Sequence, residues 1–560
     1  MRCFDANCSY GRVARPAPRF ATTPDDLLAE MDWCGIDRAL VYHAAVRAAS
    51  PVTWNPVVAR DLAGMKRLKP AWAVLPTATN ELATPERMVA EMRAAGVQAL
   101  WAFPQEHHYR LDRATFRELF AILGQARVPL FAKQNLDHLR ELLVECPELT
   151  VVAVNQGPHS VERYLRPLLD DFPNLYLETS GLLVEGLIEE FCERYGPDRL
   201  LFGSGYPDQC LGGAYLRLAQ ADIGEEARAA IASGNLDRLL GWAGKAPDEP
   251  DAADVGQRIC TLSSPLARDF AERGRSAACP IIDLHGHWGP MPGGYLPAAR
   301  EETMVAALRR QGVRRIVCSA HDALFSDPEH GNAVMEAAIA RHPDLLAGYW
   351  AVNPNYPDLA RRAPQDFVAA KGFVGFKLLP DYHVCPVTSD AYRPVFEHAN
   401  TYHLPVLIHT WGGSAFNSPQ QVEIVAQRYP EARLLMGHSG YGDWETSVRL
   451  AREYPHLYLE LTACYAAHDF AMLPGGSGTP AALCSCLHVN GIIEYFVEHA
   501  GSEKIVFGTD LPWYSPHYAA GAVLFAHIAE DARHNILHRN AERLLERPVD
   551  SRQAGKVKTK

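Results

Sequence analysis

The chain has 560 residues, of which 48% are hydrophobic and 21% charged, and its formal net charge is −12. This composition excludes wholesale disorder and collagen-like structure, and the acidic balance argues against a nucleic-acid scaffold. No run approaches the roughly 20 apolar residues that span a bilayer, and the start lacks the apolar core of a signal peptide. Because the thirteen cysteines are scattered, we expect a cytoplasmic protein with reduced thiols, with neither nucleic acid nor membrane as a partner.

The two halves of the chain repeat one another in order. Asp5 and Gly11 align with Asp283 and Gly289 at one constant offset. Further matches follow in the same order: Gly35–Val41 with Gly312–Cys318, Val128–Phe131 with Leu404–Leu407, Leu175–Glu178 with Leu457–Glu460, Phe202–Pro207 with Phe507–Pro512, and Gly234–Leu240 with Arg539–Leu545. So many ordered matches indicate a tandem duplication.

Each copy alternates short apolar runs with amphipathic stretches of helical period. In the second copy the expected strands are Ile281–His285, Arg315–Ala320, Leu346–Val352, Phe373–Leu378, Pro405–His409, Arg433–His438, Leu457–Leu461 and Ile505–Asp510. The first copy gives eight matching strands, from Cys3–Ala6 through Leu200–Gly203. A doubly wound open sheet shows the same alternation, but eight βα units in roughly 250 residues favour closure. We therefore predict an α/β protein of two tandem (β/α)₈ TIM barrels.

The predicted boundaries follow from the repeat. We expect a first barrel at 1–243, a linker at 244–279 with a helix around Pro265–Arg275, a second barrel at 280–546 and a frayed tail at 547–560. The linker opens with the Pro- and acid-rich stretch Lys245–Asp251, which is typical of exposed connections. The second copy also has an insertion near Cys464–Asn490, placed to act as a lid.

Chemically active side chains end five strands of the second copy. They are His285 and His287 at strand one, Lys377 at strand four, His409 at strand five, His438 at strand six and Asp510 at strand eight. Catalytic groups of such barrels sit at the carboxyl ends of the strands, and residues two apart on a strand share a face. Each residue alone has an ordinary reading, as a satisfied polar group, a helix cap or an internal ion pair. Together they predict a metal site, because imidazole and carboxylate suit zinc, manganese, iron or nickel.

The second copy resembles the amidohydrolase superfamily, in the amidohydrolase-related branch that includes aminocarboxymuconate-semialdehyde decarboxylase-like proteins. The motifs that carry the resemblance are Asp-Leu-His-Gly-His at 283–287, Gly-Phe-Lys-Leu at 375–378, Leu-Ile-His-Thr at 407–410, Gly-His-Ser-Gly at 437–440 and Phe-Gly-Thr-Asp-Leu-Pro-Trp at 507–513. The resemblance implies that a divalent metal is held by His285, His287 and Asp510, with His409 in mononuclear members. In binuclear members a carboxylated lysine, here Lys377, bridges two ions, and His409 and His438 bind the second. The number of ions stays open.

The chemistry of such a site suits hydrolysis, and the related decarboxylases use the same ligands. Hydrolysis is favoured here because Gly-Phe-Lys-Leu and Thr-Asp-Leu-Pro-Trp resemble the motifs of the hydrolase members more closely. We expect Zn²⁺ first, with Mn²⁺, Fe²⁺ or Ni²⁺ as alternatives, and a metal-bound water whose pKa falls to about 7. Asp510 is placed to accept the proton of that water and to pass it to a leaving group, while His438 and the metal stabilise the oxyanion and His409 completes the catalytic set. The expected substrate is an amide, ester or lactone of a small carboxylated or cyclic compound. The alternatives are a non-oxidative decarboxylase and, in a different class, a non-catalytic scaffold or binding protein.

Six residues that follow barrel strands are candidates for substrate contact: His321, Tyr382, His383, Trp411, Tyr441 and Trp513. Aromatic side chains at this rim could line a pocket for a flat or cyclic substrate. The competing interpretation is that they only pack the loops.

The first copy lacks the ligand set. Its residues at the six positions are Asn7 for His285, Ser9 for His287, Trp101 for Lys377, Lys133 for His409, Asn155 for His438 and Gly205 for Asp510. We therefore predict a barrel without metal, which serves as the built-in partner in an intramolecular pseudo-dimer, with further homo-oligomers open. The alternative is a ligand site formed by Asp5, Lys133, His159 and Asp208.

Overall fold

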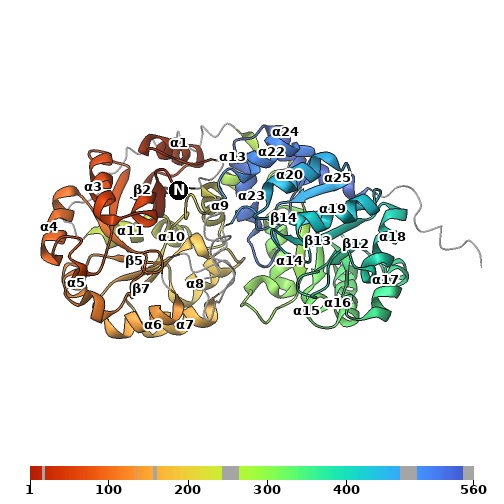
Figure 1. Ribbon diagram of the computed structural model, residues 1–560, viewed down its shortest axis with the longest axis horizontal. Helices are drawn as coiled ribbons and strands as arrows, with labels where there is room; N and C mark the ends of the chain where they lie inside the picture. Colours follow the sequence, from red (N-terminus) through yellow and green to blue (C-terminus); the bar gives the residue numbers. More distant parts are fainter. Residues whose placement is uncertain (15–18, 134, 155–160, 242–263, 467–488, 547–560) are drawn as a thin grey trace, which may run out of the picture. The chain divides into compact units, whose positions relative to one another are not determined.

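The computed structural model describes residues 1–14, 19–133, 135–154, 161–241, 264–466 and 489–546. They divide into two compact units, each with one eight-stranded parallel sheet (Figure 1). Unit 1 comprises Met1–Ala271, Gly293–Tyr295 and the described residues of 466–491, and unit 2 comprises the rest. The division falls inside helix α13 (Pro265–Arg273), in the segment expected to be a linker. The rest of that linker, most of the insertion and the tail lie outside the described residues.

In unit 1, strands alternate with helices along the whole chain. The strands are β1 (Phe4–Tyr10), β2 (Arg38–His43), β3 (Leu68–Ala73), β4 (Ala99–Ala102), β5 (Leu130–Ala132), β6 (Val151–Ala153), β7 (Leu175–Glu178) and β8 (Leu200–Leu201). The helices are α1 (Pro24–Cys34), α2 (Ala44–Ala48), α3 (Pro51–Asp61), η1 (Thr77–Thr79), α4 (Pro85–Ala95), α5 (Arg113–Ala126), α6 (Leu136–Glu145), α7 (Glu162–Asp171), η2 (Thr179–Gly181), α8 (Leu187–Tyr195), α9 (Leu211–Ala219), α10 (Glu225–Ala229), the π-helix η3 (Ala230–Gly234) and α11 (Asn235–Leu240).

Unit 2 repeats this order. Its strands are β9 (Ile281–Trp288), β10 (Val313–Ala320), β11 (Leu346–Val352), β12 (Phe373–Leu378), β13 (Pro405–Trp411), β14 (Arg433–Tyr441), β15 (Leu457–Glu460) and β16 (Ile505–Val506). Its helices are η5 (Pro297–Ala299), α14 (Glu301–Arg310), α15 (His321–Phe325), α16 (Pro328–Arg341), α17 (Pro357–Ala369), η6 (Asp390–Tyr392), α18 (Arg393–Tyr402), α19 (Pro419–Arg428), α20 (Trp444–Glu453), α22 (Ile492–Ala500), η8 (Ser502–Lys504), α23 (Pro516–Leu524), α24 (Glu530–His534), the π-helix η9 (Asn535–Arg539) and α25 (Asn540–Leu545).

Both sheets run through their strands in sequence order and then return to the first strand. In unit 1 the backbone N–H of Ala6 donates to the carbonyl of Phe202 at 2.8 Å, and in unit 2 that of Leu284 donates to Phe507 at 2.9 Å. Parallel bridges between Cys8 and Tyr206 and between Gly286 and Leu511 continue these contacts. The predicted fold, two tandem (β/α)₈ barrels, is confirmed.

The barrel interiors are filled by apolar side chains, as the alternation along parallel strands requires. In unit 2 the interior includes Leu284, Val317, Tyr349, Leu407 and Leu435, all buried. Buried polar side chains lie near the carboxyl ends of several strands, among them His287, Lys377, His438 and Glu460. Among the described residues, no helix combines the length and the apolar character needed to cross a bilayer.

Two strand boundaries differ from the expected ones in a way that shapes the site. Strand β9 continues to Trp288, so that His285 and His287 lie inside hydrogen-bonded strand rather than at its end. Strand β16 stops at Val506, so that Asp510 lies in the loop beyond it. The loop turns through Asp510, whose φ is 58°, and the residue's N–H donates to the carbonyl of His285 at 2.7 Å. This bond fixes the loop against the strand that bears the two histidines.

Candidate metal centre and active site

Three predicted ligands converge at the mouth of the second barrel. The Nε2 atoms of His285 and His287 each lie 3.0 Å from Oδ1 of Asp510. His285 is fully buried and His287 nearly so. An ion placed among these three atoms would meet two imidazole nitrogens and one carboxylate oxygen, a donor set that binds zinc and related divalent ions.

Asp510 is held as a carboxylate. Burial opposes its ionisation, but the neighbouring His285 and His287 outweigh burial and hold its pKa well below the usual range. Burial lowers the pKa of His285 well below its ordinary value, so this imidazole is neutral at neutral pH. A neutral imidazole and an ionised carboxylate are the forms that bind metal.

A buried glutamate that the sequence reasoning missed orients His285. Nδ1 of His285 lies 2.8 Å from Oε2 of Glu460, which ends β15 and is fully buried. The same oxygen accepts the backbone N–H of His438 at 3.1 Å, and Oε1 accepts the N–H of Thr462 at 2.7 Å. When Nδ1 of His285 donates to this carboxylate, Nε2 presents its lone pair to the ligand cluster, which is the usual outer partner of a metal-binding histidine.

His438 and His409 form a second pair beside the first three ligands. Nε2 of His438 lies 3.0 Å from Nδ1 of His409, and Nδ1 of His438 lies 3.1 Å from the carbonyl of Thr462. Burial lowers the pKa of His438 well below its ordinary value. Nε2 of His409 lies 3.3 Å from Oδ2 of Asp381, a second carboxylate that the sequence reasoning missed. His438, His285 and Glu460 also form a compact group of metal-binding atoms.

Lys377 reaches into the same cluster from β12. Its Nζ lies 2.7 Å from Nε2 of His285, and burial lowers its pKa to about 8. A lysine with a lowered pKa is neutral more often than a surface lysine and is correspondingly more reactive as an amine. Its position fits the bridging role that the resemblance implies for a lysine after the fourth strand.

The six candidate substrate residues occupy different environments. Trp411 stacks on Tyr441 with ring centroids 4.6 Å apart, and Tyr441 lies buried beneath it. Nε1 of Trp513 donates to Nε2 of His321 at 3.2 Å, and the His321 ring stacks on His287 at 4.9 Å. Both pairs adjoin metal-ligand candidates: Trp411 stacks on His409 with ring centroids 6.1 Å apart, and His321 stacks on His287.

The remaining two candidates point in opposite directions. The ring of Tyr382 is exposed and meets His409 edge-on at 5.4 Å. His383 is buried, and its Nε2 lies 2.9 Å from the carbonyl of Leu324. Tyr382 therefore borders the mouth, whereas His383 joins the loop to α15.

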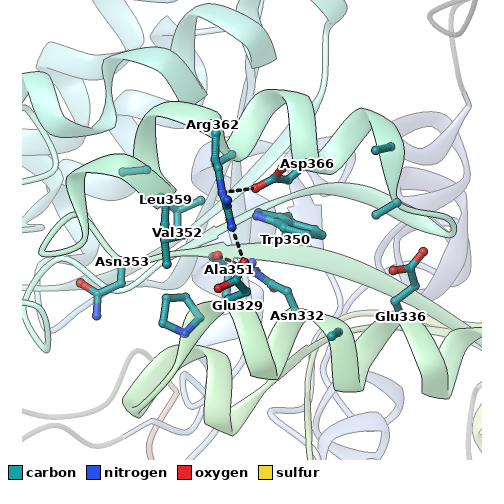
Figure 2. A pocket seen from close by; sticks show the side chains of 16 residues that line it. Glu329, Asn332, Glu336, Trp350, Ala351, Val352, Asn353, Leu359, Arg362 and Asp366 are labelled. Carbon is teal, nitrogen blue, oxygen red and sulfur yellow. Dashed lines mark hydrogen bonds and ion pairs between the residues drawn. The ribbon is translucent and has the colours of Figure 1, made fainter.

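A pocket of about 330 Å³ lies elsewhere, on the outside of the second barrel (Figure 2). Helices α16 and α17 and the outer face of β11 line it, and Arg362 pairs there with Glu329 and with Asp366, the latter at 3.0 Å. Asn332 bonds both backbone groups of Ala351 at 3.0 Å. None of the predicted metal or substrate residues lines this pocket.

The mouth of the first barrel is built differently. Asn7 replaces His285, and its Nδ2 donates to Oε1 of Glu178 at 3.4 Å. Trp101, in place of Lys377, is fully buried and stacks on Phe131 at 5.2 Å. Gly205 has a φ of 71°, so the turn of Asp510 is kept without its carboxylate.

The described members of the alternative ligand set of the first copy are buried or have partners within the barrel. The carboxylate of Asp5 is buried against Ser204, and Asp208 pairs with Arg47 at 3.1 Å, which also binds Glu106 at 2.6 Å. Lys133 is buried, and His159 and Asn155 lie outside the described residues. No group of metal-binding side chains was found among the described residues of this barrel.

Comparison with known proteins shows which family the chain belongs to. A sequence model described as Amidohydrolase matches residues 11–242 and 282–547, one segment in each copy. No curated protein matches. Solved structures that resemble the chain include 5-carboxyvanillate decarboxylase from Sphingomonas paucimobilis, 14% identical with a TM-score of 0.36 over 48% of this chain and 100% of that one. The 2,6-dihydroxybenzoate decarboxylase from Rhizobium is 17% identical, with a TM-score of 0.35 over 48% and 98%.

A dihydroxybenzoic acid decarboxylase from Polaromonas sp. JS666, solved with bound manganese, is 16% identical, with a TM-score of 0.35 over 48% of this chain and 97% of that one. The matched family segments cover more than half of the chain and include the strands of both barrels. The resemblance inferred from the motifs and the duplication are thereby confirmed: the chain belongs to the amidohydrolase family.

Proposed function

We propose that the second barrel is a metal-dependent hydrolase that cleaves an amide, ester or lactone of a small organic compound. The observation that carries the proposal is the ionised carboxylate of Asp510, whose Oδ1 lies 3.0 Å from both His285 Nε2 and His287 Nε2. The low pKa keeps this carboxylate ionised at neutral pH, and the ionised form is the one that binds a metal and has a free oxygen to accept a proton. Hydrolysis needs such an acceptor, because water must lose a proton as it attacks.

His285, His287 and Asp510 would hold the metal, which we propose to be zinc, and His409, His438 and Lys377 lie beside them. When bound, it would supply Lewis acidity for activating water and polarising a carbonyl. Asp510 accepts the proton of the attacking water and returns it to the leaving group. His438, oriented by Thr462, faces the cluster with Nε2 and orients the substrate carbonyl. Glu460 fixes the tautomer of His285.

The rim favours a flat or cyclic substrate. Trp411, Tyr382 and Trp513 are partly or largely exposed and stand next to His409 or His321. Aromatic faces contribute binding energy to planar groups without a fixed polar pattern. The proposed partner of the chain is accordingly a small molecule, and the first barrel acts as a built-in structural partner that binds no metal.

The test is a substrate screen in ¹⁸O-labelled water with carbon dioxide detection. Lactones, amides, esters and aromatic carboxylates are incubated with the zinc- or manganese-loaded chain. Hydrolysis places ¹⁸O in the product acid without carbon dioxide release, and Asp510→Asn abolishes it. Carbon dioxide release without ¹⁸O incorporation into a product acid would overturn the proposal in favour of the decarboxylase.

A scaffold without catalysis makes a different prediction, which metal analysis separates. The proposed enzyme carries at least about one divalent ion per chain as purified or after loading. If the chain carries far less than one ion and cannot be loaded, the catalytic proposal fails, whatever the substrate screen yields.

A further inference from the structure

A second group of metal-binding side chains lies at the opposite end of the second barrel from Asp510. It consists of Cys279, two residues before β9, and of His534 and His538, on α24 and the π-helix η9. One ligand atom from each residue lies within 4.8 Å of the others. We propose that Cys279, His534 and His538 bind a structural zinc ion, independent of the catalytic centre.

The geometry of the histidine pair suits one ion. Nδ1 of His534 lies 3.1 Å from Nε2 of His538. Two nitrogens on a tetrahedral zinc ion with bonds of about 2.0–2.1 Å lie about 3.3 Å apart. The pair therefore needs only a small adjustment to share an ion, and the thiol of Cys279 is within reach of both.

The second nitrogen of His538 has the partner that a zinc-binding imidazole usually has. Its Nδ1 lies 3.3 Å from Oε2 of Glu542, whose other oxygen binds Arg314 at 2.6 Å. A carboxylate at Nδ1 holds the proton there and leaves the Nε2 lone pair for the metal. Arg314 binds the other oxygen of this carboxylate, so Glu542 contacts both His538 and Arg314.

The three candidate ligands are shielded from solvent to different degrees. Cys279 is 1% exposed and His538 8%, whereas His534 is partly exposed. Cysteine binds zinc as the thiolate, so metal binding would release the thiol proton. The burial of Cys279 protects that thiolate from oxidation.

The fold does not require these histidines. The first barrel has a π-helix at the same place, η3, and the residues that correspond to His534 and His538 there are Ala229 and Ser233. Met1 stands where the second copy has Cys279. A π-helix at this place thus forms with small side chains, and the three candidate ligands occur only in the second copy.

The position indicates a structural role. Cys279 precedes the first strand of the barrel, and His534 and His538 belong to its last helices, so an ion would join the two ends of this domain. The amino-terminal face of such a barrel contributes stability rather than catalysis. A cross-link between segments about 255 residues apart in the chain removes much conformational freedom from the unfolded state.

Cobalt provides a test that separates the two centres, because only this one contains a thiolate. The full-length chain with His285→Ala and His287→Ala, which disables the catalytic cluster, is titrated with Co²⁺. We expect a thiolate-to-cobalt charge-transfer band that saturates at one equivalent. Cys279→Ser should abolish the band, His534→Ala should weaken cobalt binding at least tenfold, and Glu542→Gln should weaken it about 10- to 100-fold. Cys146→Ser, at a buried thiol of unit 1, is the matched control and should keep the band.

Thermal unfolding gives a second readout. In the His285→Ala and His287→Ala background, zinc should raise the midpoint for unit 2 and should leave it unchanged when Cys279→Ser or His534→Ala is added. The absence of a cobalt–thiolate band, or its persistence in Cys279→Ser, would overturn the proposal. In that case His534 and His538 only share a hydrogen bond, and zinc would leave the midpoint unchanged.

Discussion

The two barrels share a buried aspartate on the first strand and a buried glutamate at the end of the seventh strand, which we call the frame. They differ in the side chains that surround this frame. In unit 1, Asp5 accepts the N–H of Asn7 at 2.9 Å and that of Ser204 at 2.9 Å. In unit 2, Asp283 accepts the N–H of His285 at 2.9 Å and that of Thr509 at 3.2 Å. The aspartate therefore ties the first strand to the loop after the eighth in both copies. Its role is to close the barrel, with or without a metal.

The glutamate that ends the seventh strand is shared in the same way. Glu178 and Glu460 each accept a backbone N–H two residues further on, at 2.8 and 2.7 Å. A glycine faces each of them, since a Cβ on Gly203 or Gly508 would lie 2.1 or 2.0 Å from the carboxylate. Only in the second copy does the glutamate also contact a histidine ring, that of His285. The second copy thus adds ligands to a frame that both copies need for folding.

The largest expected effect comes from replacing a ligand and its counterpart. His285→Ala should remove the metal of the catalytic cluster, which lowers the metal content but leaves the ion at Cys279, and should lower turnover by about 10²–10³-fold or more, the scale of losing a group that stabilises developing charge. Asn7→Ala and Lys133→Ala should leave both unchanged, because the first barrel contributes no ligand. Elemental analysis and steady-state kinetics measure the two effects. A loss of metal in Asn7→Ala would show that the first barrel is also a metal site.

The next prediction compares Trp101 with Lys377, which occupy the same position on the fourth strand of the two barrels. Trp101 is fully buried among Tyr42, Phe103 and Phe131, so Trp101→Ala should destabilise unit 1 by about 3–5 kcal/mol. Lys377→Met should change the stability of unit 2 by no more than about 1 kcal/mol, because it removes a buried amine whose pKa burial has lowered. Hydrogen exchange resolved by peptide reports each unit separately. A large destabilisation by Lys377→Met would mean that the lysine supports the fold rather than the site.

A smaller effect is expected from the shared glutamates. Glu460→Gln should weaken metal binding about 10- to 100-fold, because the amide no longer holds His285 in the required tautomer. Glu178→Gln, its matched control, should leave metal affinity unchanged. Competition with a chelator measures the affinity, and circular dichroism verifies that both variants fold. Equal affinities in the two variants would remove Glu460 from the ligand-orienting role.

Most of the fold and of the ligand candidates could be predicted from the sequence, because both depend on local sequence patterns. Apolar runs at regular spacing predicted the strands, and His285, His287 and Asp510 stood out at strand ends. Glu460 was missed for a physical reason: the Leu-Tyr-Leu-Glu motif occurs in both copies, so a search for residues lost from the first copy passes over it. Only the 2.8 Å contact with His285 reveals its second role.

Contacts between distant residues were beyond reach of the sequence. Asp381 follows a proline in a loop, and nothing in its surroundings predicts the contact with His409. His383 and Tyr382 are neighbours in sequence, yet one is buried against Leu324 and the other is exposed. The orientation of loop side chains depends on tertiary packing, which a periodic pattern does not encode.

The smallest expected effect is a pH dependence of the free energy of unfolding of unit 1, which tests the protonation of Asp5. Burial raises the pKa of Asp5 to about 7 from its ordinary value near 4, against the bonds from Ser204 and Asn7. Between about pH 4 and pH 7 the unfolded chain has released this proton, whereas the folded barrel still holds it. The free energy of unfolding of unit 1 should therefore fall as pH rises through this window, with a contribution of at most about 1.4 kcal/mol per pH unit, and level off above pH 7.

Asp5→Asn removes the titrating proton while retaining an oxygen that can accept the two N–H groups. Hydrogen exchange at pH 5, 6, 7 and 8 measures the unfolding free energy of unit 1 in wild type and variant. The wild type should lose stability relative to the variant as the pH rises to 7, and above pH 7 the difference should stay constant. Because other carboxylates titrate equally in both proteins, the difference isolates Asp5. Parallel curves would mean that Asp5 is ionised in the folded barrel, so that the first copy holds a buried negative charge at this position.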